Sequence, residues 1–270
     1  MDAKQTVEMF LQIPVDKSEG VFDLFAGLPG AIYQKGAKPL ERFVYIPGTR
    51  KDRVVLVAHG DTVWDENYGN PKTAELRFEN GVFFSGSDCC GIGADDRAGC
   101  AMVWALRNSG HSLLIVDGEE KGKHGAKYLR AQHKKLFREL NRHRFMMEMD
   151  WAGTGGCLYN QVDNTNGFKA YIANKLGFVD SKKKGGCDLQ ILCQKVCGVN
   201  VGIGWNFCHT AKETLTLSQW ESSYIALKSF LEQTHPRFPI PWYFRAKRLG
   251  SRIKGKLGTL LRKCKLLPAK

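Results

Sequence analysis

Residues 54–63 read VVLVAHGDTV, an apolar run that ends in His59, Gly60 and Asp61. The uninterrupted apolar residues 54–58 predict a buried strand. A lone histidine after a strand is ordinarily a surface or structural residue. Asp61 adds a second feature, because a carboxylate that accepts a hydrogen bond from one ring nitrogen makes the imidazole a better metal ligand through the other. The stretch therefore predicts a strand with a candidate ligand, His59, at its carboxyl end.

Strand-like and helix-like segments alternate on both sides of this stretch. Predicted strands cover residues 42–46, 54–58, 112–117, 145–149 and 199–203. Apolar residues spaced by three and four predict helices over residues 98–108, 124–140, 168–176 and 217–233. This alternation is typical of a largely parallel sheet covered by helices. We therefore expect an α/β fold, a three-layer α/β/α sandwich with a mixed, mostly parallel sheet.

Length and composition limit the class of protein. A chain of 270 residues with 43% hydrophobic residues suits one sizeable globular domain. Its nine cysteines, an odd number without a CxxC pair, argue against a disulfide scaffold or a zinc finger. The N-terminus lacks the pattern of a secretion signal, and the sequence has no run of about 18 apolar residues. We therefore expect a cytoplasmic protein.

The net charge of +13 is concentrated near the C-terminus. Residues 236–270 hold eleven Lys or Arg and no acidic residue, which leaves 29 basic and 27 acidic residues in 1–235. Pro236, Pro239 and Pro241 mark the change, because proline stops a preceding helix. We expect two units, a near-neutral body of residues 1–235 and a basic tail of residues 236–270.

Paired carboxylates follow two of the predicted elements. The turn GIGADDRAG, residues 91–99, places Asp95 and Asp96 at the start of a helix. One aspartate there would serve as an ordinary N-cap, but two exceed that need. Glu119 and Glu120 follow the next predicted strand. Of two neighbouring glutamates, one can point toward a metal ion and the other toward a water molecule, as hydrolases require.

Two more candidates complete the set. Asp150 ends the strand-like stretch MMEMD, and His209 lies in FCHTAKE, residues 207–213. Each alone would carry little weight. Ligands bind at the carboxyl ends of strands in open α/β sheets, so we expect these side chains to gather at one edge.

The ordered motifs AHGDTV, GADDRAG, DGEEKG and CHTAKETL resemble those of the zinc-dependent exopeptidases with two co-catalytic metals. This superfamily includes bacterial leucyl aminopeptidases, tripeptidase T, carboxypeptidase G and succinyl-diaminopimelate desuccinylase. The resemblance runs from about Val54 to Trp220. It implies the phosphorylase/hydrolase-like zinc peptidase fold and makes residues 1–235 the catalytic domain.

The resemblance also implies a set of metal ligands. Asp95 would bridge two divalent ions, with His59 and Asp150 completing one position and Glu120 and His209 the other. Two histidines with carboxylates form the nitrogen and oxygen environment that zinc accepts, and cobalt or manganese are alternatives. Family members often have a cis peptide bond after the bridging aspartate, here between Asp95 and Asp96.

Catalytic roles follow in the same way. Asp61 would orient His59, and Glu119 would be the general base. Metal binding can lower the pKa of water from 15.7 to about 7, so a base near such a water can start amide hydrolysis at neutral pH. Glu119 would take the proton and return it to the departing amine.

Several activities fit this chemistry. An aminopeptidase acting on short peptides is the first expectation, and a deacylase or carboxypeptidase acting on N-acyl amino acids is the alternative. An acidic pocket would hold a free amine, whereas Arg97 or the run of lysines at 182–184 would hold a carboxylate. A second alternative is a non-catalytic protein that binds a membrane or nucleic acid through its basic tail.

The segment between Asp150 and His209 is short. Residues 151–208 leave no room for the lid domain that many relatives insert there, so a lidless form is expected. Tyr159, Asn206 or residues 182–184 would have to replace the contacts of a lid.

Cysteines flank the candidate site. Cys89 and Cys90 precede Asp95, and Cys208 adjoins His209. Small buried thiols are the usual explanation, and an additional or regulatory metal ligand is the alternative.

The basic tail has its own pattern. Within residues 242–267 the apolar residues recur every three or four positions among lysines and arginines, as in a basic amphipathic helix. One explanation is a solubilising or packing extension without a partner. The alternative is a tail that binds an anionic membrane surface or a protein partner, and binding to a membrane would place the protein peripherally there. Nucleic acid is not expected, because the tail carries no recognition motif.

Overall fold

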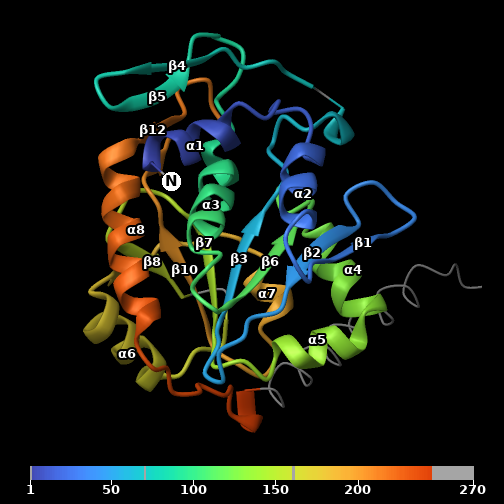
Figure 1. Ribbon diagram of the computed structural model, residues 1–270, viewed down its shortest axis with the longest axis vertical. Helices are drawn as coiled ribbons and strands as arrows, with labels where there is room; N and C mark the ends of the chain where they lie inside the picture. Colours follow the sequence, from blue (N-terminus) through green and yellow to red (C-terminus); the bar gives the residue numbers. More distant parts are fainter. Residues whose placement is uncertain (1, 70, 160–161, 245–270) are drawn as a thin grey trace, which may run out of the picture.

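The computed structural model, which describes residues 2–69, 71–159 and 162–244, is built on an eight-stranded sheet (Figure 1). In spatial order its strands are β1 (Ile32–Lys35), β2 (Arg42–Ile46), β6 (Ser112–Val116), β3 (Val55–His59), β7 (Met146–Trp151), β10 (Gly198–Gly202), β8 (Gly156–Leu158) and β9 (Val179–Asp180). The central strands β6, β3, β7 and β10 are parallel, and β1, β2 and β8 pair antiparallel with their inner neighbours. The predicted mixed, mostly parallel sheet is confirmed.

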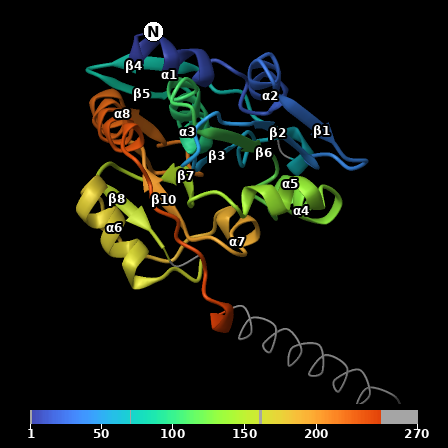
Figure 2. The same cartoon turned by 60° about the horizontal axis from the view of Figure 1, so that its bottom comes forward.

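Helices cover both faces of this sheet (Figures 1 and 2). The core on one face includes residues of α1 (Ala3–Leu11), α2 (Glu19–Ala26), α3 (Ala94–Ala105), α6 (Asn166–Leu176) and α8 (Leu217–Glu232). The core on the other face includes residues of α4 (His124–Gln132), α5 (Lys134–Leu140) and α7 (Leu189–Leu192). The three-layer α/β/α arrangement is therefore confirmed.

Strand β3 shows why its sequence is apolar without alternation. Leu56 and Ala58 contribute to the core under α3, whereas Val55 and Val57 contribute to the core under α4 and α7. Side chains alternate across a strand, so a strand with a helix layer on each face is apolar at every position. The polar residue that ends it, His59, is consequently held by a rigid, fully buried element.

A smaller antiparallel sheet lies beyond the carboxyl ends of β3 and β7, at the top of Figure 1. Its strands, in spatial order, are β11 (Trp205–Asn206), β12 (Thr214–Thr216), β5 (Val82–Ser85) and β4 (Leu76–Glu79). None of its strands was among those predicted from the sequence. It matters for the site, because the loop that carries His209 connects β11 to β12.

The single helix predicted over residues 124–140 is wrong. The structure has two helices, α4 and α5, which meet at His133 with non-helical torsion angles of φ −105° and ψ 54°. The His133 ring packs edge-on against Phe43 at 4.9 Å and against Tyr128 at 5.0 Å between ring centres. This packing holds His133 over the sheet and turns the chain between the helices. Helices α1 and α2 were also not predicted.

The predicted tail falls largely outside the described residues, which end at 244. Its first nine residues, 236–244, are described, and they contact the body: Cys197 N–H donates to the Phe238 carbonyl at 2.9 Å, and Ile240 N–H donates to the Lys195 carbonyl at 2.9 Å. Among residues 2–69, 71–159 and 162–244, no helix combines the length and apolarity needed to cross a membrane.

Candidate metal centre

The register of the parallel strands β3 and β7 brings His59 beside Asp150. Val57 pairs with Glu148, and His59 and Asp150 each lie two residues further along their strands. Because side chains two residues apart share a face, both project to the same side of the sheet. His59 Nε2 lies 3.7 Å from Asp150 Oδ1, and both side chains are buried.

Asp95 lies between the two histidines. Its Oδ1 is 3.3 Å from His59 Nε2, and its Oδ2 is 3.1 Å from His209 Nε2. The Asp95–Asp96 peptide bond is cis, as the resemblance implied. Asp96 turns the other way, and its Oδ2 accepts a hydrogen bond from the His59 backbone N–H at 3.0 Å. The adjacent carboxylates therefore separate, one into the site and one under the β3 backbone.

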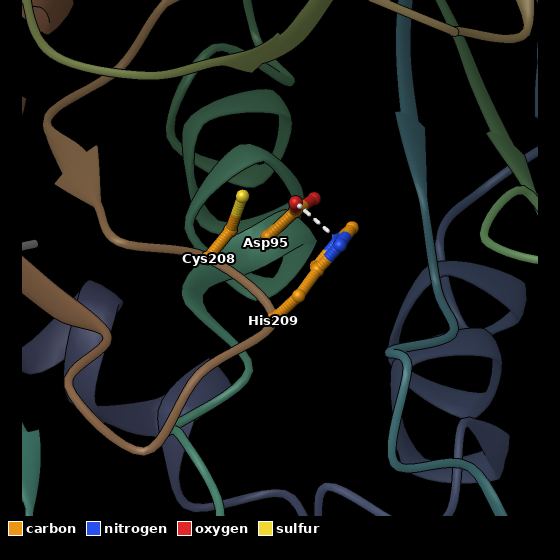
Figure 3. A group of neighbouring side chains, drawn as sticks. All are labelled: Asp95, Cys208 and His209. Carbon is orange, nitrogen blue, oxygen red and sulfur yellow. Dashed lines mark ion pairs between the residues drawn. The ribbon is translucent and has the colours of Figure 1, made fainter.

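His209 and Glu120 form the second half of the group. His209 Nε2 lies 3.0 Å from Glu120 Oε2, and Figure 3 shows the His209 ring directed at the Asp95 carboxylate. The His209 side chain is 48% exposed, whereas that of His59 is 1% exposed. The site is thus buried on its β3 side and open to solvent on its His209 side.

Asp61 contacts His59 and the acidic loop after β6. His59 Nδ1 lies 3.1 Å from the Asp61 carbonyl oxygen and 3.3 Å from Asp61 Oδ1. Both atoms are acceptors, so Nδ1 carries a hydrogen and Nε2 faces the other carboxylates. Asp61 also accepts hydrogen bonds from the backbone N–H groups of Glu119 and Glu120 at 3.1 and 3.2 Å.

Glu119 has a basic neighbour that the sequence analysis did not assign. Its Oε1 forms an ion pair with Nζ of Lys123, four residues further on, at the end of the turn that precedes α4. Burial alone would lower the pKa of Lys123, but the Glu119 carboxylate raises it above its usual value. Glu119 is 8% exposed, so its carboxylate lies at the edge of the solvent-accessible site.

The carboxylates strongly perturb the two imidazoles. Burial opposes a charge on His59, but contacts with Asp150 and Asp61 raise its pKa well above the ordinary value. Hydrogen bonds to Asp95 and Glu120 raise the pKa of His209 to about 10. Each ring thus lies where surrounding carboxylates favour positive charge.

The carboxylates compete with one another. Burial and the neighbouring Asp95 raise the pKa of Glu120 to about 7, and the same two causes raise the pKa of Asp150 well above its usual range. Burial also opposes the charge of Asp95, but hydrogen bonds from His209 and His59 hold its pKa below the usual range. Such a cluster favours cations at its centre.

These residues fit a metal centre by their spacing. Two ligands of one tetrahedral zinc ion lie ~3.3 Å apart, given metal–ligand bonds of about 2.0–2.2 Å. The pairs that involve His59 or His209 are 3.0 to 3.7 Å apart. Glu120 Oε1 is buried, and none of the described residues forms a hydrogen bond with it, so a cation would satisfy this oxygen. The donor set therefore fits divalent ions.

Other residues hold the candidate ligands in place. Asn200 Oδ1 accepts from the Asp150 N–H at 3.0 Å, and Tyr68 donates its hydroxyl to Asp61 Oδ2 at 2.6 Å. Glu213 accepts from the backbone N–H groups of Gly93 and Asp95. None of these residues was among the site residues predicted from the sequence. Only Glu213 carried a signal, because it lies within the quoted motif CHTAKETL.

The suggested role of Arg97 in binding a substrate carboxylate is wrong. Its side chain is fully buried, and Nη2 donates to the carbonyl groups of Pro14 and Lys17 at 3.2 and 2.7 Å. Tyr159 is 4% exposed and packs on Phe168, so it also does not face solvent. Lys182, Lys183 and Lys184 lie in a loop, and all three are exposed.

Comparison with known proteins gives a family and a fold. The model of peptidase family M28 matches residues 43–183, slightly more than half of the chain. A comparison with curated proteins found no match.

Solved structures of peptidases share the architecture. Aminopeptidase PepT from Bacillus cereus matches with a TM-score of 0.62 and 13% identity, over 86% of this chain and 98% of that chain. A tripeptidase from Staphylococcus aureus matches with a TM-score of 0.59 and 12% identity, over 86% and 98%. The TET1 peptidase from Pyrococcus horikoshii matches with a TM-score of 0.59 and 13% identity, over 85% and 99%. At such identities the likeness establishes the fold.

Proposed function

The chain belongs to peptidase family M28, and from that premise we propose that it is an aminopeptidase that acts on short peptides with two divalent metal ions. Membership of a peptidase family argues against the alternative of a non-catalytic protein that binds only through its tail.

The position of Asp95 carries the proposal. Its two oxygens lie 3.3 Å from His59 Nε2 and 3.1 Å from His209 Nε2, so one carboxylate faces two imidazoles. We assign Asp95 as the bridging ligand, with Asp150 beside His59 and Glu120 beside His209. Zinc is the expected ion, with cobalt and manganese as alternatives, because the donors are imidazole nitrogens and carboxylate oxygens.

The chemistry requires a base and a positioned water. When bound, two such ions polarise the scissile carbonyl and lower the pKa of the attacking water. We assign Glu119 as the residue that takes the proton from this water and gives it to the departing amine. Asp61 accepts a hydrogen bond from the Glu119 backbone and another from the His59 ring. It thereby fixes the proposed base, Glu119, relative to the proposed metal ligand His59.

The charge of the site favours a substrate with a free amine. Carboxylates surround the centre, and the buried residues Glu148 and Asp188 also favour the charged form of Lys123. Arg97 does not offer its charge to a ligand, as its hydrogen bonds to Pro14 and Lys17 show. The alternative, a deacylase or carboxypeptidase of N-acyl amino acids, would depend on Lys123 or on the exposed lysines of residues 182–184.

Metal content tests this proposal directly. We expect about two zinc, cobalt or manganese ions per purified chain, the number a two-metal mechanism requires. Asp95→Ala is expected to lose most of them, and Asp23→Ala, which changes an exposed aspartate on α2, is the matched control. The absence of metal from the wild type after reconstitution would refute the two-metal mechanism. Hydrolysis of aminoacyl substrates but not of N-acyl amino acids would then separate the aminopeptidase from its alternative.

A further inference from the structure

Cys208 lies at the proposed metal centre, in the loop between β11 and β12 (Figure 3). Adjacent residues of an extended chain point to opposite sides. Here Phe207 and His209 have positive φ angles of 56° and 64°, so the chain turns sharply on both sides of Cys208. Figure 3 shows the Cys208 and His209 side chains rising from this loop to either side of the Asp95 carboxyl group.

The three side chains lie within the range of one ion. Cys208 Sγ, a ring nitrogen of His209 and a carboxylate oxygen of Asp95 all lie within 4.8 Å of one another. In a tetrahedral zinc site a sulfur and an oxygen ligand lie about 3.7 Å apart, because the bonds are roughly 2.3 and 2.2 Å long, and the 4.8 Å limit of this group is close to that separation. A small rotation of the Cys208 side chain would therefore complete a coordination sphere.

A second observation points to a cation at the same place. Glu120 Oε1 is buried and has no hydrogen-bond partner within residues 2–69, 71–159 and 162–244, and Oε2 of the same carboxylate lies 3.0 Å from His209 Nε2. A buried carboxylate oxygen that lacks a donor is costly unless a cation satisfies it. Glu120 Oε1 and the Cys208 thiol therefore both point to a cation at the position between His209 and Asp95.

We propose that Cys208 supplies a thiolate ligand to the metal ion held by Asp95, Glu120 and His209, an inference that rests on the proposed function and deepens it. A thiol that coordinates a divalent ion loses its proton to solvent as the metal–sulfur bond forms. The two metal positions then differ, because the described residues offer nitrogen and oxygen donors, and no sulfur, to the position at His59 and Asp150.

The consequence is a preference among metals. Thiolate ligands favour zinc and other thiophilic ions, whereas carboxylate-rich sites also suit manganese and magnesium. The position at His209 therefore selects zinc, cadmium or cobalt over manganese. The competing explanation for Cys208 at this place is hydrophobic packing, since it is half-buried against the core that includes residues of α3 and α8.

Cobalt substitution distinguishes these explanations by a signal other than activity. Metal-free protein is titrated with Co²⁺, with the bound cobalt quantified by mass spectrometry and the near-ultraviolet spectrum recorded. We expect a sulfur-to-cobalt charge-transfer band in the wild type and its loss in Cys208→Ser. Cys89→Ser, which removes an exposed thiol that bonds Ser87, is the matched control and is expected to keep the band.

Metal selectivity gives a second readout. Cadmium affinity of Cys208→Ser is expected to fall by roughly tenfold or more, since the loss even of an outer-sphere partner costs a metal site on that order. Manganese affinity is expected to change far less.

Each outcome decides the proposal. If the wild type binds cobalt without the charge-transfer band, or if the band persists in Cys208→Ser, Cys208 is not a metal ligand. Either result would leave the proposal of a two-metal peptidase intact. A failure of the wild type to bind cobalt at all would overturn both. Circular dichroism of Cys208→Ser controls for misfolding, and the wild-type spectrum remains decisive if this variant does not fold.

Discussion

Glu213 accepts a hydrogen bond from the backbone N–H of Asp95 at 3.0 Å, across 118 positions of sequence. Its other carboxylate oxygen accepts from the Gly93 N–H at 2.7 Å. Burial raises the pKa of Glu213 to about 8, and these hydrogen bonds oppose that rise. Glu213 therefore fixes the backbone on which the proposed bridging ligand is placed.

Replacement of Glu213 by glutamine should weaken both the fold and the metal centre. An amide offers only one oxygen, so its NH₂ group would face one of the N–H donors of Gly93 and Asp95. We expect a loss of about 1–3 kcal/mol in the free energy of unfolding, the cost of a buried donor without an acceptor. Urea denaturation and metal content measure the two effects. Glu232→Gln, at an exposed position, is the control, and unchanged values in Glu213→Gln would contradict this role.

Glu119→Gln should separate metal binding from catalysis. The amide has the shape of the carboxylate but cannot take a proton from water. We expect the metals to remain and turnover to fall by at least roughly 100-fold, in line with general-base contributions. Steady-state kinetics on an aminoacyl substrate, together with metal analysis, measure this effect. Glu66→Gln changes an exposed glutamate and serves as control; wild-type turnover in Glu119→Gln would remove Glu119 from the mechanism.

The residues grouped at the site could be predicted because each follows a local signal. His59 and Asp150 end apolar strands, Asp95 follows a glycine-rich turn, and Glu120 follows the end of β6. Strand ends meet at one edge of a parallel sheet, so local patterns were enough to indicate their proximity. The architecture followed from the same alternation of strands and helices.

Supporting residues could not be predicted, because their roles depend on tertiary contacts. In the sequence Asn200 is one residue of a predicted strand with no sign of a special role. Its role depends on the hydrogen bonds between its side chain and the Asp150 backbone, which only the fold brings together. In the sequence Arg97 is a cation two residues from Asp95, but α3 directs its side chain toward the carbonyl groups of Pro14 and Lys17. Helix α2 has only eight residues, too few to show a clear period.

Lys123→Met tests the ion pair with the proposed base. The Lys123 side chain is 15% exposed and the Glu119 side chain 10% exposed, so the pair is largely removed from water. Removal of one partner leaves a buried charge, and we expect a loss of about 3 kcal/mol in the free energy of unfolding. Urea denaturation of the metal-free protein measures it. Lys121→Met, at a neighbouring exposed lysine, is expected to change stability by less than about 1 kcal/mol. Equal stability of the two variants would show that the pair contributes nothing.

His143 is a buried neutral imidazole that should make stability depend on pH. Its Nδ1 lies 3.1 Å from the Glu139 carbonyl oxygen, which can only accept, so Nδ1 carries the hydrogen. Its Nε2 then accepts from the Ser112 hydroxyl at 2.8 Å, and that hydroxyl accepts from the Gly48 N–H at 2.9 Å. A proton on Nε2 would disrupt this chain of hydrogen bonds, and burial lowers the pKa of His143 to about 4.

The direction of the effect follows from proton binding. An unfolded histidine titrates near pH 6.5, so between about pH 4 and 6.5 the unfolded chain binds a proton that folded His143 does not. The stability contribution is therefore complete above pH 6.5 and is lost as the pH falls toward 4. We expect wild type to lose about 2 kcal/mol more than His143→Gln between pH 7 and pH 5, because each pH unit is worth about 1.4 kcal/mol per proton. Urea denaturation across this range measures the difference, and parallel profiles above pH 7 provide the internal control. Profiles that stay parallel down to pH 5 would show that His143 titrates alike in the folded and unfolded chains.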